Sequence, residues 1–111
     1  MKGSSALTSK LESEIELLER HVTMLKVIKE HEPIGIISLS QVTSIEQHKV
    51  RYSLRILEHE GLIAPSPKGA VTTEKAKLFF NDLRVILDGM DKKVKTIRED
   101  LDKPASLKEN H

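Results

Sequence analysis

The stretch from Ser44 to Ile63, SIEQHKVRYSLRILEHEGLI, constrains the fold most, because it has the pattern of an amphipathic helix closed by a glycine. Val50, Leu54 and Leu57 recur at helical spacing and form an apolar stripe. The glycine near the end of the stretch stands where a helix C-terminus favours a left-handed residue. Between Gln47 and Leu57 the sequence has three cations and no carboxylate. We therefore expect a helix with one buried face and one basic face.

The length and the net charge of the chain limit the size of the core and the extent of any basic surface. A chain of 111 residues is long enough for one modest core. Its net charge is +1, from 18 cations and 17 acids, so any basic surface must be local. The absence of cysteine excludes disulfides, thiol chemistry and cysteine-based zinc sites. The sequence has no apolar run of membrane-spanning length and no signal-peptide pattern, and we expect a cytoplasmic protein.

Both ends of the chain carry apolar residues at alternating three- and four-residue spacing, which predicts long helices with a coiled-coil seam. The last helix would be roughly 40 Å long, longer than a domain of this size is wide, so its far end needs a partner. One interpretation is that the two helices pack on each other within one chain. We expect instead a homodimer, with these dimerisation residues: Leu11, Ile15, Leu18, Leu87, Met90, Val94, Ile97 and Leu101.

Capping and turn signals predict the boundaries of the elements. Thr8 or Ser9 is expected to cap the first helix, Pro33 to end it, and Thr73 to cap the last helix. Ser44 and Gln47 have capping-box spacing for the basic helix. The predicted division is a flexible N-terminus 1–8, one domain 9–103 and a polar tail 104–111. Within the domain we expect a helix 9–32, a helix-turn-helix 36–43 and 45–60, a hairpin 62–72 and a helix 73–103.

This order of elements resembles the winged helix-turn-helix domain of small bacterial and archaeal transcription regulators. The likeness is carried by Leu39, Ile45, the run VRYSLRILEHEGLI and Thr73-Glu74-Lys75, and it covers roughly residues 20–85. It implies a mainly α fold with a small β-hairpin, namely a winged helix-turn-helix with long N- and C-terminal helices. It also implies that the second helix of the helix-turn-helix enters the DNA major groove.

Under this resemblance, double-stranded DNA is the expected partner of the basic helix. The candidates for contact in the groove are Gln47, His48, Lys49, Arg51 and Tyr52. Gln and Arg side chains can read adenine and guanine in a bidentate way. Arg55 lies one turn further on, where it suits a backbone phosphate, and Lys68 is the only cation of the hairpin tip. Such a wing is short and weakly basic for the family.

Each of these residues also has a plainer interpretation. The basic face can be a solvated helix surface that lacks acids, and Tyr52 can be a packing residue that covers the turn. The histidines have no spacing typical of a zinc site, so no metal is expected. No cofactor-binding or catalytic motif occurs, and we expect no enzyme activity.

Two functions remain open from the sequence. The first is a homodimeric, sequence-specific transcription regulator that binds DNA through residues 47–55. The second is a winged-helix protein-interaction module in transcription or chromosome machinery, which the near-neutral total charge and the weak wing favour. The sequence identifies neither a small-molecule effector nor the operator, and it does not distinguish a repressor from an activator.

Overall fold

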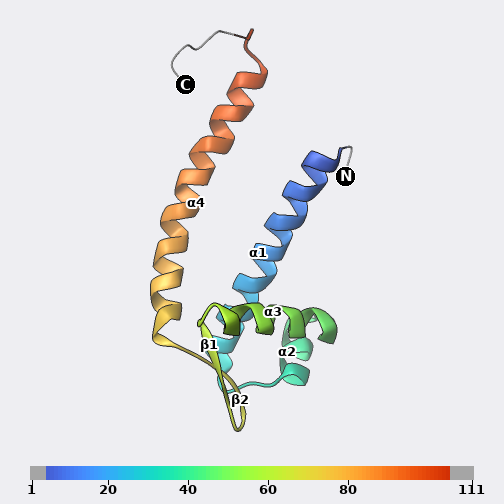
Figure 1. The fold of residues 1–111 in the computed structure, drawn as a ribbon, viewed down its shortest axis with the longest axis vertical. Helices are drawn as coiled ribbons and strands as arrows, with labels where there is room; N and C mark the ends of the chain where they lie inside the picture. Colours follow the sequence, from blue (N-terminus) through green and yellow to red (C-terminus); the bar gives the residue numbers. More distant parts are fainter. Residues whose placement is uncertain (1–4, 106–111) are drawn as a thin grey trace. The chain divides into compact units, whose positions relative to one another are not determined.

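The computed structural model describes residues 5–105, in which four helices and one hairpin follow one another along the chain (Figure 1). The elements are α1 (Ala6–His31), α2 (Ile36–Thr43), α3 (Gln47–His59), β1 (Ile63–Ser66), β2 (Gly69–Thr72) and α4 (Glu74–Leu101). The predicted fold class is confirmed: the chain is mainly α, with a winged helix-turn-helix and long terminal helices.

The structure forms two compact units, which are described separately. The first unit ends at Lys77 and contains the helix-turn-helix and the hairpin, whereas the second begins at Leu78 and contains most of α4. The division into one domain 9–103 stays a prediction. The predicted flexible N-terminus and polar tail lie partly outside the described residues.

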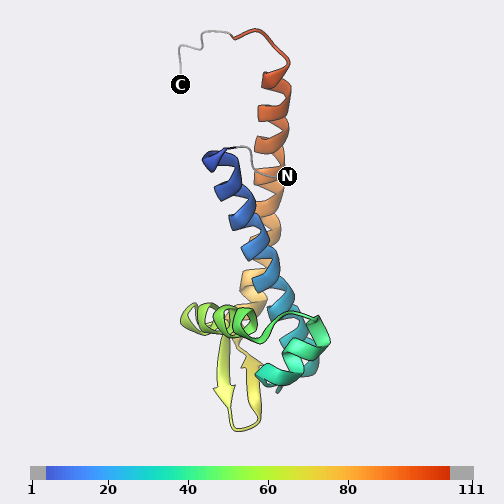
Figure 2. The same cartoon turned by 90° about the vertical axis from the view of Figure 1, so that its right-hand side faces the viewer.

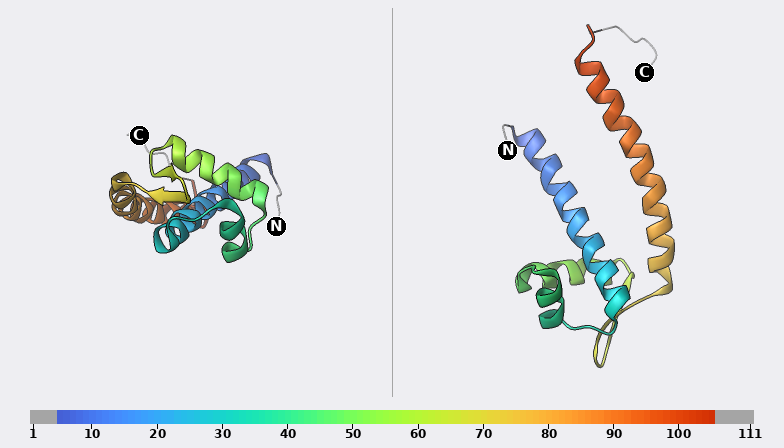
Figure 3. Two further views of the ribbon diagram at one scale, coloured as in Figure 1. Left: turned by 90° about the horizontal axis from the view of Figure 1, so that it is seen from below. Right: turned by 180° about the vertical axis from the view of Figure 1, so that it is seen from behind.

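The core of the first unit lies where α1, α2, α3 and the hairpin meet. In the views of Figures 2 and 3, α2 and α3 lie against the C-terminal half of α1, and the tip of the hairpin projects beyond both of them. Met24, Leu25 and Ile28 from α1 are fully buried, together with Leu39 from α2 and Val50 from α3. Because aromatic residues are few, aliphatic side chains and one methionine fill this core.

The start of α1 differs from the prediction. Ser5, rather than Thr8 or Ser9, caps the helix, because its hydroxyl accepts a hydrogen bond from the Thr8 N–H at 3.1 Å. The Thr8 hydroxyl instead donates back to the Ser5 carbonyl at 3.2 Å. Residues 6–8, which were assigned to the flexible N-terminus, are therefore helical. The predicted end of α1 before Pro33 is confirmed, since the helix stops at His31.

The turn between α2 and α3 also differs from the prediction. Ser44 does not cap α3, because it adopts a left-handed conformation with φ of 60° and ends α2 instead. The N-cap residue of α3 is Glu46, whose side chain makes no capping bond. The Ser40 and Thr43 side chains hold the turn, through bonds to the carbonyl and the N–H of Ile45 respectively. Ser44 thus reverses the chain at the end of α2, whereas its capping-box spacing predicts that it caps the start of α3.

The hairpin and its neighbours form a small antiparallel ladder. Ile63 pairs with Thr72, and Ser66 pairs with Gly69 across a two-residue turn. Ile34 adds a bridge to Ala70 on the other side of β2. The Thr73 hydroxyl donates to the Gly61 carbonyl at 2.7 Å, and this bond ties the hairpin to the end of α3. The helix α4 begins at Glu74, directly after Thr73, so Thr73 stands at the predicted N-terminal boundary of α4.

Candidate nucleic-acid interface

The face of α3 opposite the core carries the side chains that the sequence singled out. Val50, Ser53 and Leu57 are buried against the rest of the first unit, and this fixes the rotation of the helix. Every predicted contact residue on the helix is exposed: Gln47, His48, Lys49, Arg51, Tyr52 and Arg55. At 3.6 residues per turn, His48, Tyr52 and Arg55 form the row farthest from the buried stripe. The helix thus presents one continuous polar surface about two turns long.

The charges on this surface are uneven. The Glu46 carboxylate lies 3.7 Å from His48 Nε2 and 4.0 Å from Lys49 Nζ, and all three side chains are well exposed. The acid just before the helix therefore screens its first cations. Within residues 5–105, the structure shows no ion pair for Arg51 or Arg55. These two guanidinium groups are accordingly the cations of α3 most available to an external anion.

The side chain of Tyr52 is partly packed and partly exposed. The sequence alone did not decide between a packing residue and a contact residue. Its side chain is 40% exposed, yet its ring lies 6.0 Å from the His21 ring, with an angle of 35° between the planes. The Arg20 guanidinium stands 5.9 Å from the same ring, within the range of a cation–π contact. One side of Tyr52 therefore packs on α1, and the remaining part belongs to the exposed surface of α3.

The sequence did not reveal how α1 holds α3 in place. Arg20 Nε donates to Ser53 Oγ at 3.2 Å, and His21 Nδ1 lies 2.9 Å from the same oxygen. Burial lowers the pKa of His21 below its usual value of 6.5, and the nearby Arg20 charge acts in the same direction. The neutral imidazole is therefore favoured. Ser53 lies three residues after Val50, so helical spacing alone could have placed it inward, but no sequence signal pairs it with residues 20 and 21.

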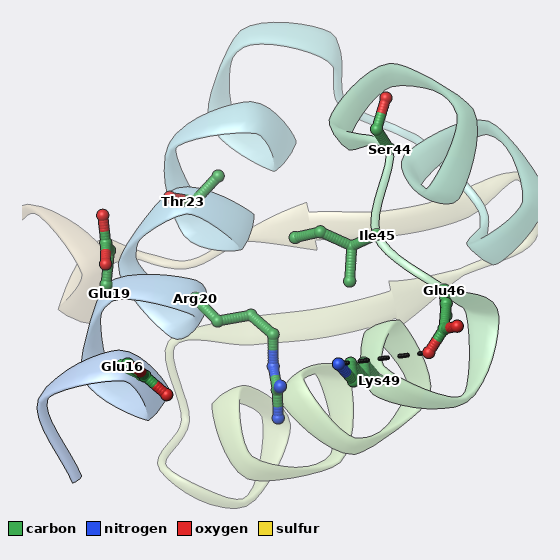
Figure 4. A pocket seen from close by; sticks show the side chains of 8 residues that line it. All are labelled: Glu16, Glu19, Arg20, Thr23, Ser44, Ile45, Glu46 and Lys49. Atoms are coloured by element: carbon green, nitrogen blue, oxygen red, sulfur yellow. Dashed lines mark ion pairs between the residues drawn. The ribbon is translucent and has the colours of Figure 1, made fainter. Parts of the chain in front are cut away.

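An open pocket of about 590 Å³ lies beside this contact, between α1 and the turn before α3 (Figure 4). Arg20 extends across it from α1, and Lys49 lies on its α3 side, paired with Glu46 (Figure 4). Glu16 and Glu19 add two further carboxylates from α1. Both acidic and basic side chains line the pocket, so neither sign of charge predominates in it.

The hairpin turn contributes one cation. Lys68 is exposed at the tip, as predicted from its place in the turn. Gly69 follows it with a positive φ of 134°, and a Cβ placed there would lie only 2.5 Å from the backbone carbon of Ile34. Between the hairpin and α3, an apolar hollow of about 310 Å³ leaves Leu54 half-buried. Leu54 therefore covers less of the core than its place in the predicted stripe suggested.

The predicted dimerisation residues are mostly exposed within their own units. In the first unit, Leu11 and Ile15 are 63% and 54% exposed, whereas Leu18 is half-buried. In the second unit, exposure of the seam residues of α4 runs from 43% at Leu87 to 79% at Leu101. Met90, Val94 and Ile97 lie between these values. Most of these apolar side chains therefore remain exposed to solvent within their own unit.

The described residues contain neither a metal-binding cluster nor a membrane-spanning helix. Among residues 5–105, no three His, Asp or Glu side chains come together as a metal-binding group. In the same part of the chain, no helix is both long and apolar enough to cross a membrane.

The fold is a winged helix-turn-helix: α2 and α3 form the helix-turn-helix, the hairpin follows it along the chain, and long helices stand at both ends. A solved structure with a similar fold is the activation domain of the phage T4 transcription factor MotA. The TM-score is 0.54, the sequence identity is 18%, and the match covers 70% of this chain and 83% of that domain. At this sequence identity, the similarity shows only that the two folds are alike. No protein-family model matches the chain, and no curated protein matches it either.

Proposed function

We propose that the chain is a homodimeric, sequence-specific DNA-binding regulator of the winged helix-turn-helix type, with α3 in the major groove. The observation that carries the proposal is the exposed face of α3, on which Arg51 and Arg55 stand without intramolecular ion pairs among the described residues. An arginine in this place can bind guanine in a bidentate way or bind a backbone phosphate. Glu46 screens His48 and Lys49, so the two arginines carry most of the electrostatic attraction.

The proposal gives different roles to the residues on this face. Gln47 and Arg51 are four residues apart, on the same side of the helix, and are suited to base edges. Arg55 and the hairpin cation Lys68 are suited to phosphates on either side of the groove. Tyr52, held from behind by His21 and Arg20, supports the orientation of the face and adds one hydroxyl group to it. No catalytic activity is assigned to the chain.

The test is duplex binding by Arg51→Ala and Arg55→Ala, with Lys26→Ala as the charge-matched control on an exposed site of α1. Genomic fragments selected by the wild-type protein would supply the duplex. Loss of a base contact should weaken binding roughly tenfold or more. Loss of a phosphate contact should also reduce the slope of log affinity against log salt by about 0.9. If both arginine variants bind like the control at every salt concentration, the proposed use of α3 is wrong.

A second candidate is a protein-interaction module within the transcription machinery. The likeness to an activation domain of a transcription factor favours it, as do the net charge of +1 and the single cation at the hairpin tip. The discriminating experiment is a gel shift against bulk genomic DNA at low salt, because a winged helix that reads DNA should also bind it non-specifically. Complete absence of binding would support the second candidate over the first.

A further inference from the structure

The apolar seam of α4 has its own pattern of flanking charges, which bears on how two copies pair. The seam runs through Phe80, Leu83, Leu87, Met90, Val94, Ile97 and Leu101, with alternating spacings of three and four residues. In heptad terms these residues occupy the a and d positions, and the last five are 43–79% exposed. The seam is therefore a candidate for burial against another helix with the same spacing.

Two rows of side chains flank this seam. The row at the e positions contains Arg84, Asp91 and Arg98, and the row at the g positions contains Ile86, Lys93 and Asp100. The residues of both rows are exposed. Because e and g residues lie against the partner helix in a coiled coil, their charges select the direction and the register of pairing.

A parallel pair of α4 helices places each g residue beside the e residue five positions later on the second copy. Lys93 then faces Arg98 of the second copy, and the contact occurs twice by symmetry. Asp91 faces the apolar Ile86, so no opposite charges meet along the helix. The parallel arrangement therefore has repulsion on both sides of the seam and no attraction to offset it.

An antiparallel pair places e residues against e residues and a residues against d residues. When the two-fold axis passes between Asp88 and Gly89, Arg84 faces Asp91 of the second copy, twice by symmetry. The same register stacks Leu83 on Val94 and Leu87 on Met90, each with its symmetry mate. One unfavourable contact, Lys77 against Arg98, also occurs twice by symmetry, but it falls at the exposed ends, where charges interact weakly.

Neighbouring antiparallel registers overlap less and bring like charges together near the centre of the pairing. A shift of one heptad toward the C-terminus places Asp91 and Lys93 each against its own symmetry mate. A shift toward the N-terminus places Arg84 against its symmetry mate, and the attraction that it gains, Lys77 with Asp91, involves a residue of the first unit. Both shifts also shorten the paired length, whereas the register centred near Gly89 pairs residues 78–99 of the second unit, about 33 Å of helix at 1.5 Å per residue. That length is most of α4.

We infer that α4 is an antiparallel self-association helix whose two-fold axis passes between Asp88 and Gly89, with Arg84 of each copy paired to Asp91 of the other. The inference rests on the homodimer in the proposed function, but not on DNA binding. It has a geometric consequence: the two Glu74 residues, at which the α4 helices begin, lie about 44 Å apart along the coiled-coil axis.

Because the full chain has no cysteine, a single introduced cysteine can report the direction of pairing directly. Glu99 is exposed on the outer side of α4, and Glu99→Cys can carry a spin label. In the antiparallel register the two labels are separated by roughly 32 Å along the axis, whereas a parallel pair places them at the same height, separated only across the width of the two helices. A short distance in a dimer would overturn the inference and leave the homodimer intact.

Disulfide formation gives a second measure of the same geometry. Leu83→Cys mixed with a size-tagged Val94→Cys should yield the mixed disulfide under mild oxidation, and each variant alone should stay largely uncrosslinked. Efficient self-crosslinking of Val94→Cys would indicate parallel pairing and would overturn the inference.

Charge reversal then tests the proposed ion pairs. Arg84→Glu and Asp91→Arg should each raise the dimer dissociation constant roughly tenfold, because each change affects two symmetric contacts. The double variant should return to within about threefold of wild type. Lys92→Glu, an outward-facing charge reversal on the same helix, is the control.

Equal effects from all three single variants, or a monomer throughout the accessible concentration range, would refute the pairing. A monomer would refute the proposed homodimer as well, whereas a dimer that fails only in the DNA assay would leave the pairing standing.

Discussion

Gly69 is the residue whose replacement should damage the wing most. It combines a φ of 134° with a backbone approach so close that a Cβ would lie 2.5 Å from the Ile34 carbon and 2.6 Å from its oxygen. Gly69→Ala must therefore strain its own backbone and push the hairpin away from Ile34. The two hydrogen bonds of the bridge, Ile34 N–H to Ala70 O at 3.2 Å and Ala70 N–H to Ile34 O at 2.8 Å, would be lost together.

The expected cost can be assembled from these two effects. A strained non-glycine backbone costs about 1–3 kcal/mol. Two net hydrogen bonds add about 0.5–1.5 kcal/mol each. Gly69→Ala should therefore reduce the free energy of unfolding by roughly 2–6 kcal/mol, a large share of the ~5–15 kcal/mol typical of a domain. For a domain of this size, the midpoint of thermal unfolding should fall by at least about 8 °C.

Urea unfolding followed by far-ultraviolet circular dichroism would measure this difference. The matched control is Gly35→Ala, the same substitution next to Ile34, at a φ of −97° and with nothing within 4 Å of the added Cβ. Its effect should stay within about 1 kcal/mol, since open space and a negative φ accommodate alanine. A loss of stability no greater in Gly69→Ala than in Gly35→Ala would refute the claim that close packing on Ile34 anchors the wing.

Three further predictions concern the side chains that join the elements of the first unit. The carboxylate of Glu32 accepts bonds from the N–H and the hydroxyl of Thr72, and these bonds lower its pKa below the usual 4.5. Their stabilisation should be lost as the pH falls through that lowered pKa, and acid titration of unfolding should show a smaller loss for Glu32→Gln than for wild type. The pKa of His21 is lowered by burial and by Arg20, so the unfolded chain binds its proton first and stability should fall as pH drops below 6.5. His21→Gln should have a flatter stability profile in that window, and an unchanged slope would contradict the assignment. Ser53→Ala removes the oxygen shared by Arg20 and His21 and should cost about 1–2 kcal/mol in urea unfolding, because the site is fully buried.

The parts of the fold that depend on local signals could be predicted from the sequence. The break at Pro33 and the glycine at the end of α3 act over a few residues, and the structure has both where the sequence placed them. The apolar stripe of α3 is buried at Val50 and Leu57, as predicted, whereas Leu54 is half-buried. The predicted contact residues of α3 are exposed for the same reason, since helical spacing turns them away from Val50 and Leu57. Their use in DNA binding stays a prediction.

The features that join distant parts of the chain could not be predicted in this way. The bonds from Arg20 and His21 to Ser53 cross more than thirty residues, and those from Glu32 to Thr72 cross forty. Composition and periodicity contain no information on such pairs. The error at Ser44 has a different cause: serine can cap a helix or reverse the chain, and only the tertiary packing selects between these roles.

The position of Tyr52 also gives the protein a built-in optical probe. It is the only tyrosine in a chain without tryptophan, so near-ultraviolet excitation at its absorption band reports on this one ring. Its surroundings combine the imidazole of His21, the guanidinium of Arg20 and solvent. Intensity and anisotropy of its emission therefore monitor the junction of α1 and α3 in the unlabelled protein, both during unfolding and on titration with any ligand that approaches the exposed face of α3.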